Sequence, residues 1–280
     1  MQQTLMTQTW VVEPAHWSAK TQATLYGAAS LLGLLFLWIA ATSIFGWIDP
    51  RVLPSPFEIA LRFADLLVDP FGGATLLGHV LGSLKRWGLG VVTAAILGVP
   101  VGVLFAWAPL FRAVVNPVFE ILRYIPPFAW VPIAILWFGA STMTQAMVVF
   151  IAAFPAIVIN SQLGVQQVEK ILLDAARVYG AGSLRTLRRV VMPVAAPTIY
   201  TGIRIAVSNG WMALVGAELI VGKNGLGFLI SQGQNNDSVS TIFVGIISIG
   251  ILGLLIDTIV QRSEKILLPW RGRLDQAGGI

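Results

Sequence analysis

The stretch YIPPFAWVPIAILWFGASTMTQAMVVFIAAFPAIVINSQLGVQQV, residues 124–168, contains no aspartate, glutamate, lysine or arginine. A helix that crosses a bilayer needs about 20 apolar residues, so these 45 residues are enough for two crossings. The sequence GAST at 139–142 predicts a turn between them. The stretch therefore indicates a helical hairpin within a membrane, with helices at 118–138 and 143–163.

The remainder of the chain has the same character. Only 11% of the 280 residues are charged, against about 25% in a soluble domain, and 56% are apolar. Charge is also absent from 21–48, 87–111 and 238–256, each long enough for one crossing. The sequence therefore predicts an all-α membrane protein with six transmembrane helices, at 25–45, 87–107, 118–138, 143–163, 197–220 and 239–260.

The basic residues orient this arrangement, because lysine and arginine gather on cytoplasmic loops. Eleven of them fall on the side that carries both termini and five on the other, so both termini are predicted to be cytoplasmic. The eleven are Lys20, Arg112, Lys170, Arg177, Arg185, Arg188, Arg189, Arg262, Lys265, Arg271 and Arg273, and the five are Arg51, Arg62, Lys85, Arg86 and Lys223.

These predictions divide the chain into three parts. A cytoplasmic N-terminal segment, residues 1–24, precedes a six-helix transmembrane domain at 25–262, and a cytoplasmic tail follows at 263–280. The external segment 46–86 is rich in proline and is predicted as a surface cover with one short helix at about 58–67. The longest cytoplasmic loop, 164–196, carries most of the polar pattern.

This loop is helical in pattern although it lies between spans. A helix is predicted at 166–179, and Gly180 ends it. Ser183 is predicted to cap a second short helix, which Pro193 and Pro197 would end before the fifth span. On pattern alone the loop is either a docking element for a soluble subunit or an ordinary basic loop. The small and apolar face of its first helix consists of Val168, Leu172, Ala175, Ala176 and Tyr179.

The same loop resembles a family motif. Asp174-Ala175-Ala176, three residues, Gly180, nine residues and then VVMP at 190–193 is similar to the Glu-Ala-Ala loop of the permease subunits of binding-protein-dependent ABC importers, with the pattern EAA-x3-G-x9-I-x-L-P. Three positions differ conservatively, with aspartate for glutamate, valine for isoleucine and methionine for leucine. The resemblance implies contact with an ATPase subunit through Asp174, Ala175, Ala176, Tyr179, Gly180 and Pro193.

Further motifs resemble the taurine, sulfonate, nitrate and bicarbonate branch of that family, over about residues 53–270. They are RYIPPFAWVP at 123–132, WFG at 137–139, GIRI at 202–205, AELI at 217–220 and GLGF at 225–228.

The resemblance implies a type I ABC importer fold in the bacterial inner membrane and a small, anionic solute such as a sulfonate or oxyanion. It also implies a homodimer with two cytoplasmic ATPase subunits and an external substrate-binding protein. ATP and magnesium would bind the partner subunits, so we expect this chain to bind no cofactor.

Polar and proline residues within the spans are candidates for the translocation path or its gates. Each also has a structural alternative: Glu218 paired with Arg86 or Lys85, Arg204 paired with Asp257, and the polar side chains at 208 and 209 bonded between helices. The prolines predict a third span that is kinked or partly unwound. The candidates are Arg123, Pro126, Pro127, Arg204, Ser208, Asn209, Trp211 and Glu218.

Two other classes of protein remain to be weighed. Histidine occurs only at 16 and 79, and neither a His-Glu-x-x-His pair nor a phosphate-binding glycine loop is present, so an enzyme is not expected. An ion-coupled secondary carrier that works without ATPase partners is the alternative. Its coupling normally needs ionisable groups near the bilayer midplane, and this sequence has few.

Overall fold

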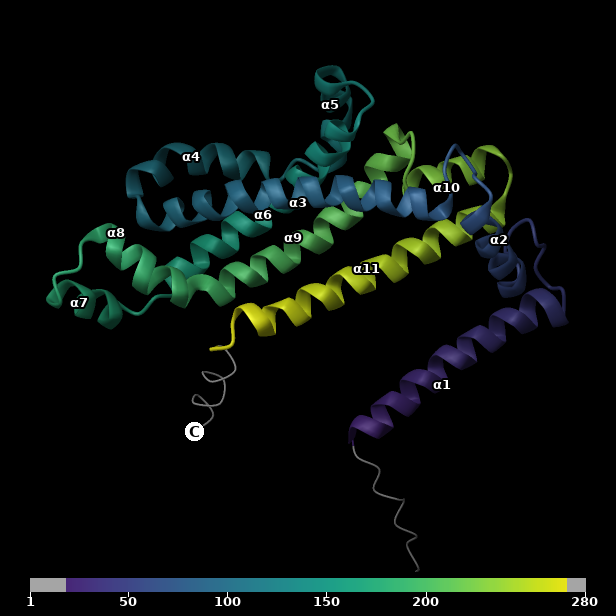
Figure 1. Cartoon of the computed structure of the whole chain (residues 1–280), viewed down its shortest axis with the longest axis horizontal. Coiled ribbons are helices and arrows are strands. Elements are labelled where there is room, and N and C mark those ends of the chain that lie inside the picture. Colours follow the sequence, from purple (N-terminus) through teal and green to yellow (C-terminus); the bar gives the residue numbers. More distant parts are fainter. Residues whose placement is uncertain (1–18, 271–280) are drawn as a thin grey trace, which may run out of the picture. The chain divides into compact units, whose positions relative to one another are not determined.

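The computed structural model describes residues 19–270, and these are helical over most of their length (Figure 1). Five of the described helices are long and apolar enough to cross a membrane, or six when one bent pair counts as a single span. The predicted all-α class is therefore confirmed. Most of the predicted N-terminal segment and half of the predicted tail, with His16, Arg271 and Arg273, lie outside the described residues.

The described chain divides into two compact units, one ending at Glu58 and the other beginning at Ile59. Its elements are α1 (Ala19–Ile39), the π-helical turn η1 (Ala40–Ile44), α2 (Pro56–Val68), α3 (Leu76–Trp107), α4 (Pro109–Leu122), the 3-10 turn η2 (Pro127–Trp130), α5 (Val131–Phe138), α6 (Thr142–Gln166), α7 (Lys170–Val178), α8 (Ser183–Thr186), the π turn η3 (Leu187–Val191), α9 (Met192–Val221), α10 (Leu226–Asn235) and α11 (Val239–Leu267).

Within the first unit, α1 and η1 form one apolar span, Thr24–Ile44, with little of its surface buried. Beyond its end the rings of Phe45 and Trp47 stack at 4.7 Å, and Trp47 is 76% exposed. Such aromatic pairs are typical of the boundary between lipid and water.

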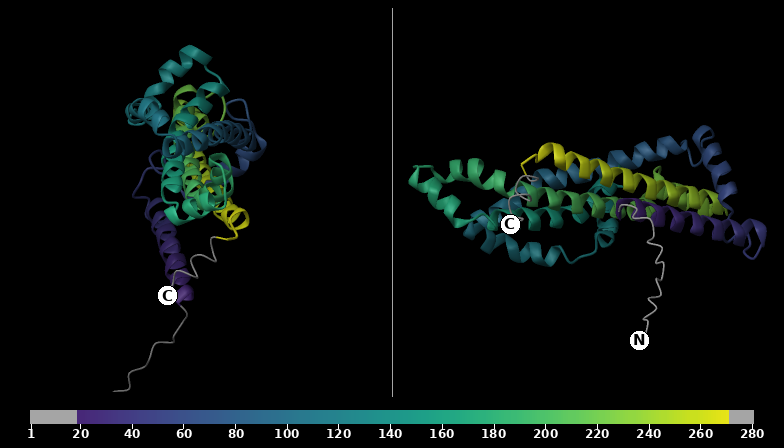
Figure 2. Two further views of the ribbon diagram at one scale, coloured as in Figure 1. Left: turned by 90° about the vertical axis from the view of Figure 1, so that its left-hand side faces the viewer. Right: turned by 90° about the horizontal axis from the view of Figure 1, so that it is seen from below.

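The core of the second unit consists of α3, α6 and α9, which run side by side (Figures 1 and 2). Glycine permits their close approach, as is common in lipid. A Cβ atom added at Gly90 of α3 would lie 2.6 Å from the carbonyl oxygen of Ala146 in α6. One added at Gly202 of α9 would lie 3.0 Å from the carbonyl oxygen of Ala156. The three helices are therefore in backbone contact.

The close packing of α3 against α6 leads to a prediction about stability. We expect Gly90→Ala to lower the free energy of unfolding by about 1 to 3 kcal/mol, because α3 and α6 must separate to admit the methyl group. Gly88→Ala is the matched control, since nothing lies within 4 Å of its added Cβ and alanine favours the helix by up to about 1 kcal/mol. Thermal unfolding in detergent micelles measures both, and equal midpoints would contradict the close packing.

The third span departs from its predicted bounds. The sequence predicts one span at 118–138, kinked or partly unwound, whereas the structure has α4 from Pro109 and a second arm, Pro127–Phe138, that differs from it in direction by 93°. Pro126 adopts an extended backbone with φ −54° and ψ 136°. Proline lacks an N–H and disfavours helix in the residue before it, so two adjacent prolines break the span here.

The second span begins at Leu76, eleven residues before the predicted start. Thr75 caps it, since its hydroxyl accepts a hydrogen bond from the Gly78 amide at 3.4 Å. Lys85, Arg86 and His79 therefore lie in α3, and the prediction that they are in the external loop is wrong. A basic residue often marks the end of a span, but the partners of Arg86 described below compensate its charge.

The long loop also differs in detail from its prediction. The helix predicted at 166–179 is the shorter α7, because α6 continues to Gln166. Ser183 is the first residue of α8 and does not cap it, since Gly182 occupies that position without a side-chain bond. Pro193 and Pro197 do not end a helix before the fifth span: α8, η3 and α9 follow without a break. The π turn directly before α9 shifts the hydrogen-bond register, so the backbone accommodates Pro193, which has no N–H.

Candidate functional site

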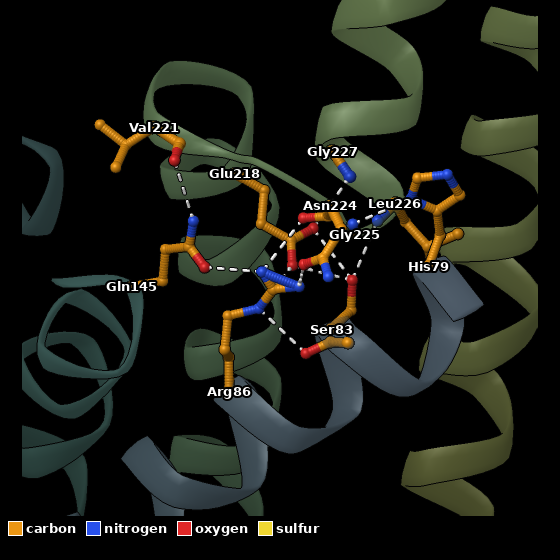
Figure 3. A network of polar contacts seen from close by, with 11 residues as sticks. His79, Ser83, Arg86, Gln145, Glu218, Val221, Asn224, Gly225, Leu226 and Gly227 are labelled. Atoms are coloured by element: carbon orange, nitrogen blue, oxygen red, sulfur yellow. Dashed lines mark hydrogen bonds and ion pairs between the residues drawn. The ribbon is translucent and has the colours of Figure 1, made fainter. Parts of the chain in front are cut away.

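A buried polar cluster joins α3, α6 and α9 at the end where α10 begins (Figure 3). We call His79, Ser83, Arg86, Gln145 and Glu218 the polar clamp, and each is less than 5% exposed. The first three lie on one face of α3, because they are separated by four and three residues. Gln145 lies in the first turn of α6, and Glu218 in the last turn of α9.

Glu218 is at the centre of the polar clamp. The Ser83 hydroxyl lies 2.8 and 3.0 Å from its two carboxylate oxygens, the Gly227 amide donates to it at 2.9 Å, and Arg86 Nε lies 3.4 Å away. Ser83 in turn accepts a bond from the Leu226 amide at 2.9 Å. The predicted ion pair between Glu218 and Arg86 is confirmed, and both carboxylate oxygens have polar partners.

Arg86 connects this carboxylate to the turn 222–225, which joins α9 to α10. Its Nη1 donates to Gln145 Oε1 at 2.8 Å and to the carbonyl of Asn224 at 3.0 Å, and its Nη2 donates to Asn224 Oδ1 at 2.5 Å. Nε donates to the carbonyl of Gly82 at 2.9 Å, and Gln145 Nε2 donates to the carbonyl of Val221 at 3.2 Å. A buried charge with this many partners is stable in place.

His79 fixes the last residue of the same turn. Its Nδ1 accepts a hydrogen bond from the Gly225 amide at 3.0 Å, which places the ring proton on Nε2, where it donates to the carbonyl of Phe71 at 2.8 Å. Gly225 has φ +113° and an added Cβ would lie 2.5 Å from Glu218 Cδ, so only glycine fits. The polar clamp therefore holds the turn 222–225 rigidly against α3.

A cavity of about 400 Å³ lies where α4 ends, beside α6 and α9. Three of the eight predicted path residues line it: Arg123, Pro127 and Asn209. The others do not, although Pro126 belongs to the same break in the chain. Apolar side chains make up most of the wall: Leu122, Ile125, Phe128, Ile151, Ala152, Pro155, Ala156, Met212 and Ala213.

The charge of this cavity is compensated. Arg123 Nε lies 2.7 Å from Glu120 Oε2, its guanidinium stacks on Tyr124 at 4.7 Å, and its Nη2 donates to the Tyr124 hydroxyl at 3.0 Å. The amide of Asn209 makes no side-chain hydrogen bond within residues 19–270 and is exposed. The structural alternative for Asn209, a hydrogen bond between helices, is therefore not formed among the described residues.

Two of the remaining path candidates, Arg204 and Trp211, tie α9 to α11. Arg204 Nε lies 3.1 Å from Asp257 Oδ1, which confirms the predicted pair. Trp211 is 6% exposed and its indole N–H donates to the carbonyl of Ile249 at 3.2 Å. Arg204 is only partly buried, so the structure leaves it accessible as well as paired.

Sequence reasoning missed several members of the polar clamp. His79, Ser83 and Gln145 were not singled out, the first two because the second span was predicted to begin at residue 87. The spacing of 79, 83 and 86 is that of one helical face and was the available signal. Their partners come from 59 to 146 residues away in the chain, and no local pattern contains that information.

The helix α7 carries an uncovered apolar stripe. The predicted face is partly wrong: Val168 and Ala176 are buried in the protein, and Val168 packs in a core cluster with Val103 and Val191. The stripe that faces away has the spacing i, i+1, i+4, i+7 and i+8, and Tyr179 at its end is 89% exposed. Its members are Ile171, Leu172, Ala175, Val178 and Tyr179.

Gly180 ends this helix in a Schellman motif. Its amide donates to the carbonyl of Arg177 at 2.9 Å, and the Ala181 amide donates to the carbonyl of Ala176 at 2.9 Å. Gly180 has φ +71°, a conformation that favours glycine, and no atom lies within 4 Å of an added Cβ. Asp174 pairs with Arg177 at 2.9 Å on the exposed surface, so its carboxylate is partly engaged within α7 itself.

Comparison with known proteins identifies this arrangement. Residues 98–272 match the family described as binding-protein-dependent transport system inner membrane component. A probable ABC transporter permease protein of Brucella abortus is 36% identical over 88% of this chain and 99% of its own length. The taurine transport system permease protein of Escherichia coli is 30% identical over 92% of this chain and 94% of its own length. The nitrate import permease protein of Synechocystis is 34% identical over 78% of this chain and 81% of its own length.

The fold is also that of a solved transporter. The inward-facing methionine ABC transporter has a chain that aligns with 68% of this one and 95% of its own length, with a TM-score of 0.59 and 22% identity. That likeness shows the fold of a type I ABC importer permease. The chain therefore belongs to the binding-protein-dependent transport system inner membrane components, as a multi-pass inner-membrane permease of the ABC importers and not an enzyme.

Proposed function

We propose that this chain forms the translocation path of an ATP-driven importer for a small anionic solute such as a sulfonate, nitrate or bicarbonate. Two copies would assemble with two cytoplasmic ATPase subunits and an external substrate-binding protein, with both termini in the cytoplasm. The N-terminal segment 1–24 and the tail 263–280 would flank a transmembrane domain at 25–262. The observation that carries this proposal is the uncovered apolar stripe on α7.

The stripe on α7 supports docking to the ATPase subunit. Val178 and Tyr179 are 84% and 89% exposed, and a loop that only faced water would gain nothing from them. An amphipathic helix of this kind suits a groove on a soluble partner. Ala175 lies in the same stripe, whereas Ala176 packs inward and supports the helix. In this proposal Gly180 and Pro193 shape the loop, and Tyr179 makes contact.

The path of coupling follows the chain. Beyond Gly180, α8, η3 and α9 form one continuous helical run that passes the cavity at Asn209. A displacement of α7 by the ATPase subunits would therefore move the wall of the cavity directly. The polar clamp fastens the other end of α9 to α3, α6 and α10. The break between α4 and α5, beside Arg123 and Pro126, is then the place where the path can change shape.

The proposed solute class comes from the relatives named for taurine, nitrate and bicarbonate transport. Arg86, Arg123 and Arg204, the arginines nearest the polar clamp, the cavity and α11, are each paired with a carboxylate. A path without an unpaired positive charge would pass an anion without trapping it. Selection would then rest on the external binding protein.

Reconstitution in vesicles tests the proposal. We expect uptake of the solute held by the cognate binding protein only when the ATPase subunits, ATP and that binding protein are all present. A chain-only vesicle under a sodium or proton gradient serves as the comparison. Uptake driven by that gradient without ATPase subunits would instead establish a secondary carrier and overturn the proposal.

A further inference from the structure

The short helix α2 has an apolar stripe that stays exposed among the described residues, 19–270. On one side Ile59 and Leu66 are 5% and 1% exposed and pack against the protein. The opposite stripe has the spacing i, i+4, i+7 and i+11, which places its members along one face of a helix. These exposed members are Phe57, Leu61, Ala64 and Val68.

The charged residues of α2 form a third stripe. Glu58 and Asp65 are exposed and lie about 80° from the centre of the exposed apolar stripe, with Arg62 between them along the helix. On the other side of the helix Ala60 and Leu67 join the exposed stripe to the buried one. A helix between protein and water needs only one apolar side. α2 instead has sides suited to protein, to water and to a second apolar medium.

Two contacts fix the level of α2 along the bundle. Arg62 Nε donates to the hydroxyl of Thr241 at 2.9 Å, in the first turn of α11, and its guanidinium stacks on Phe71 at 5.1 Å. The carbonyl of Phe71 accepts from His79 in the first turn of α3. Both spans begin at this level, which is where we place the bilayer surface in the proposal that follows. Figures 1 and 2 show it running across the direction of α11.

We propose that α2 is an interfacial membrane helix, whose stripe of Phe57, Leu61, Ala64 and Val68 lies in the headgroup and acyl-chain boundary. Lipid is the medium that surrounds the bundle at this level, and it accepts the apolar stripe while the charged stripe faces water. The Ser55 and Glu58 capping box, with bonds of 3.0 and 3.2 Å, stabilises the start of the helix. α2 thereby anchors the outer ends of α3 and α11 to the membrane surface.

The absence of cysteine from the sequence makes a direct test possible. Leu61→Cys and Val68→Cys probe the exposed apolar stripe, and Asp65→Cys is the matched control on the charged stripe of the same helix. All three positions are exposed, so the substitutions should leave folding intact. Each full-length variant is labelled with a small fluorophore in phosphatidylcholine vesicles. Quenching is measured with aqueous iodide and with lipids that carry a nitroxide near the headgroup.

We expect labels at 61 and 68 to be quenched severalfold more by the nitroxide lipid than the label at 65, and severalfold less by iodide. A depth of about 5 to 10 Å below the headgroups corresponds to an interfacial helix. Equal iodide quenching at all three positions would place the stripe in water and overturn the proposal. Protection of 61 and 68 from both quenchers would also overturn it, because a second copy or another protein would then cover the stripe.

Discussion

Glu218→Leu should lower the free energy of unfolding by about 3 to 5 kcal/mol, because it leaves Arg86 charged and buried without its carboxylate. Arg86 is 4% exposed, so water cannot replace the lost partner. The Ser83 hydroxyl and the Gly227 amide lose their acceptor at the same time. We expect most of the protein to aggregate or to unfold well below the wild-type midpoint, as measured by heating in detergent micelles.

Two further variants separate the buried charge from a general loss of packing. Adding Arg86→Met to Glu218→Leu should restore part of the stability, because the unpaired charge is removed. Asp174→Asn breaks an ion pair whose side chains are 64% and 75% exposed, and it should cost at most about 1 kcal/mol. A Glu218→Leu protein as stable as Asp174→Asn would show that the polar clamp is not essential to the fold.

Gly180→Val should abolish coupling to the ATPase subunits while leaving the isolated permease folded. At φ +71° a β-branched residue is strained, at a cost of about 1 to 2 kcal/mol, so the turn after α7 would rearrange. No neighbouring atom lies within 4 Å of a Cβ added at Gly180, so we expect the rest of the subunit to keep its structure. We expect ATP hydrolysis stimulated by the loaded binding protein to fall at least tenfold, with little ATPase subunit co-purifying.

Gly182→Val is the matched control for this substitution. Gly182 lies in the same loop with equal free space, but its φ of −67° suits any residue. We expect its stimulated ATP hydrolysis to remain near that of the wild type. If both variants hydrolyse ATP and retain ATPase subunits equally well, the conformation at Gly180 has no role in docking.

Much of the candidate site was predictable, because it depends on local patterns. The Gly180 turn follows from a helical pattern that stops at glycine, and the structure confirms it as a Schellman motif. The pairs of Arg86 with Glu218 and Arg204 with Asp257 follow from the cost of an isolated charge in a membrane. The choice of partner in each pair rests only on the similar depth of the two residues in their predicted spans. His79 and Gln145 were missed, since both have long-range partners.

The sequence by itself indicated the fold class, a series of apolar spans predicted as six, of which the described residues contain five or six, and a disruption at Pro126 and Pro127. These follow from the loss of charge over about 20 residues and from the missing N–H of proline, which are properties of the chain at that point.

Only the tertiary structure decided that α3 begins at Leu76, that the helix continues through Pro193, and that Arg123 and Asn209 line one cavity. It alone also revealed that the outer stripe of α2 is uncovered. The physical reason is that neighbours far along the chain decide whether a charge is compensated and whether an apolar face is covered. Only folding brings those neighbours together.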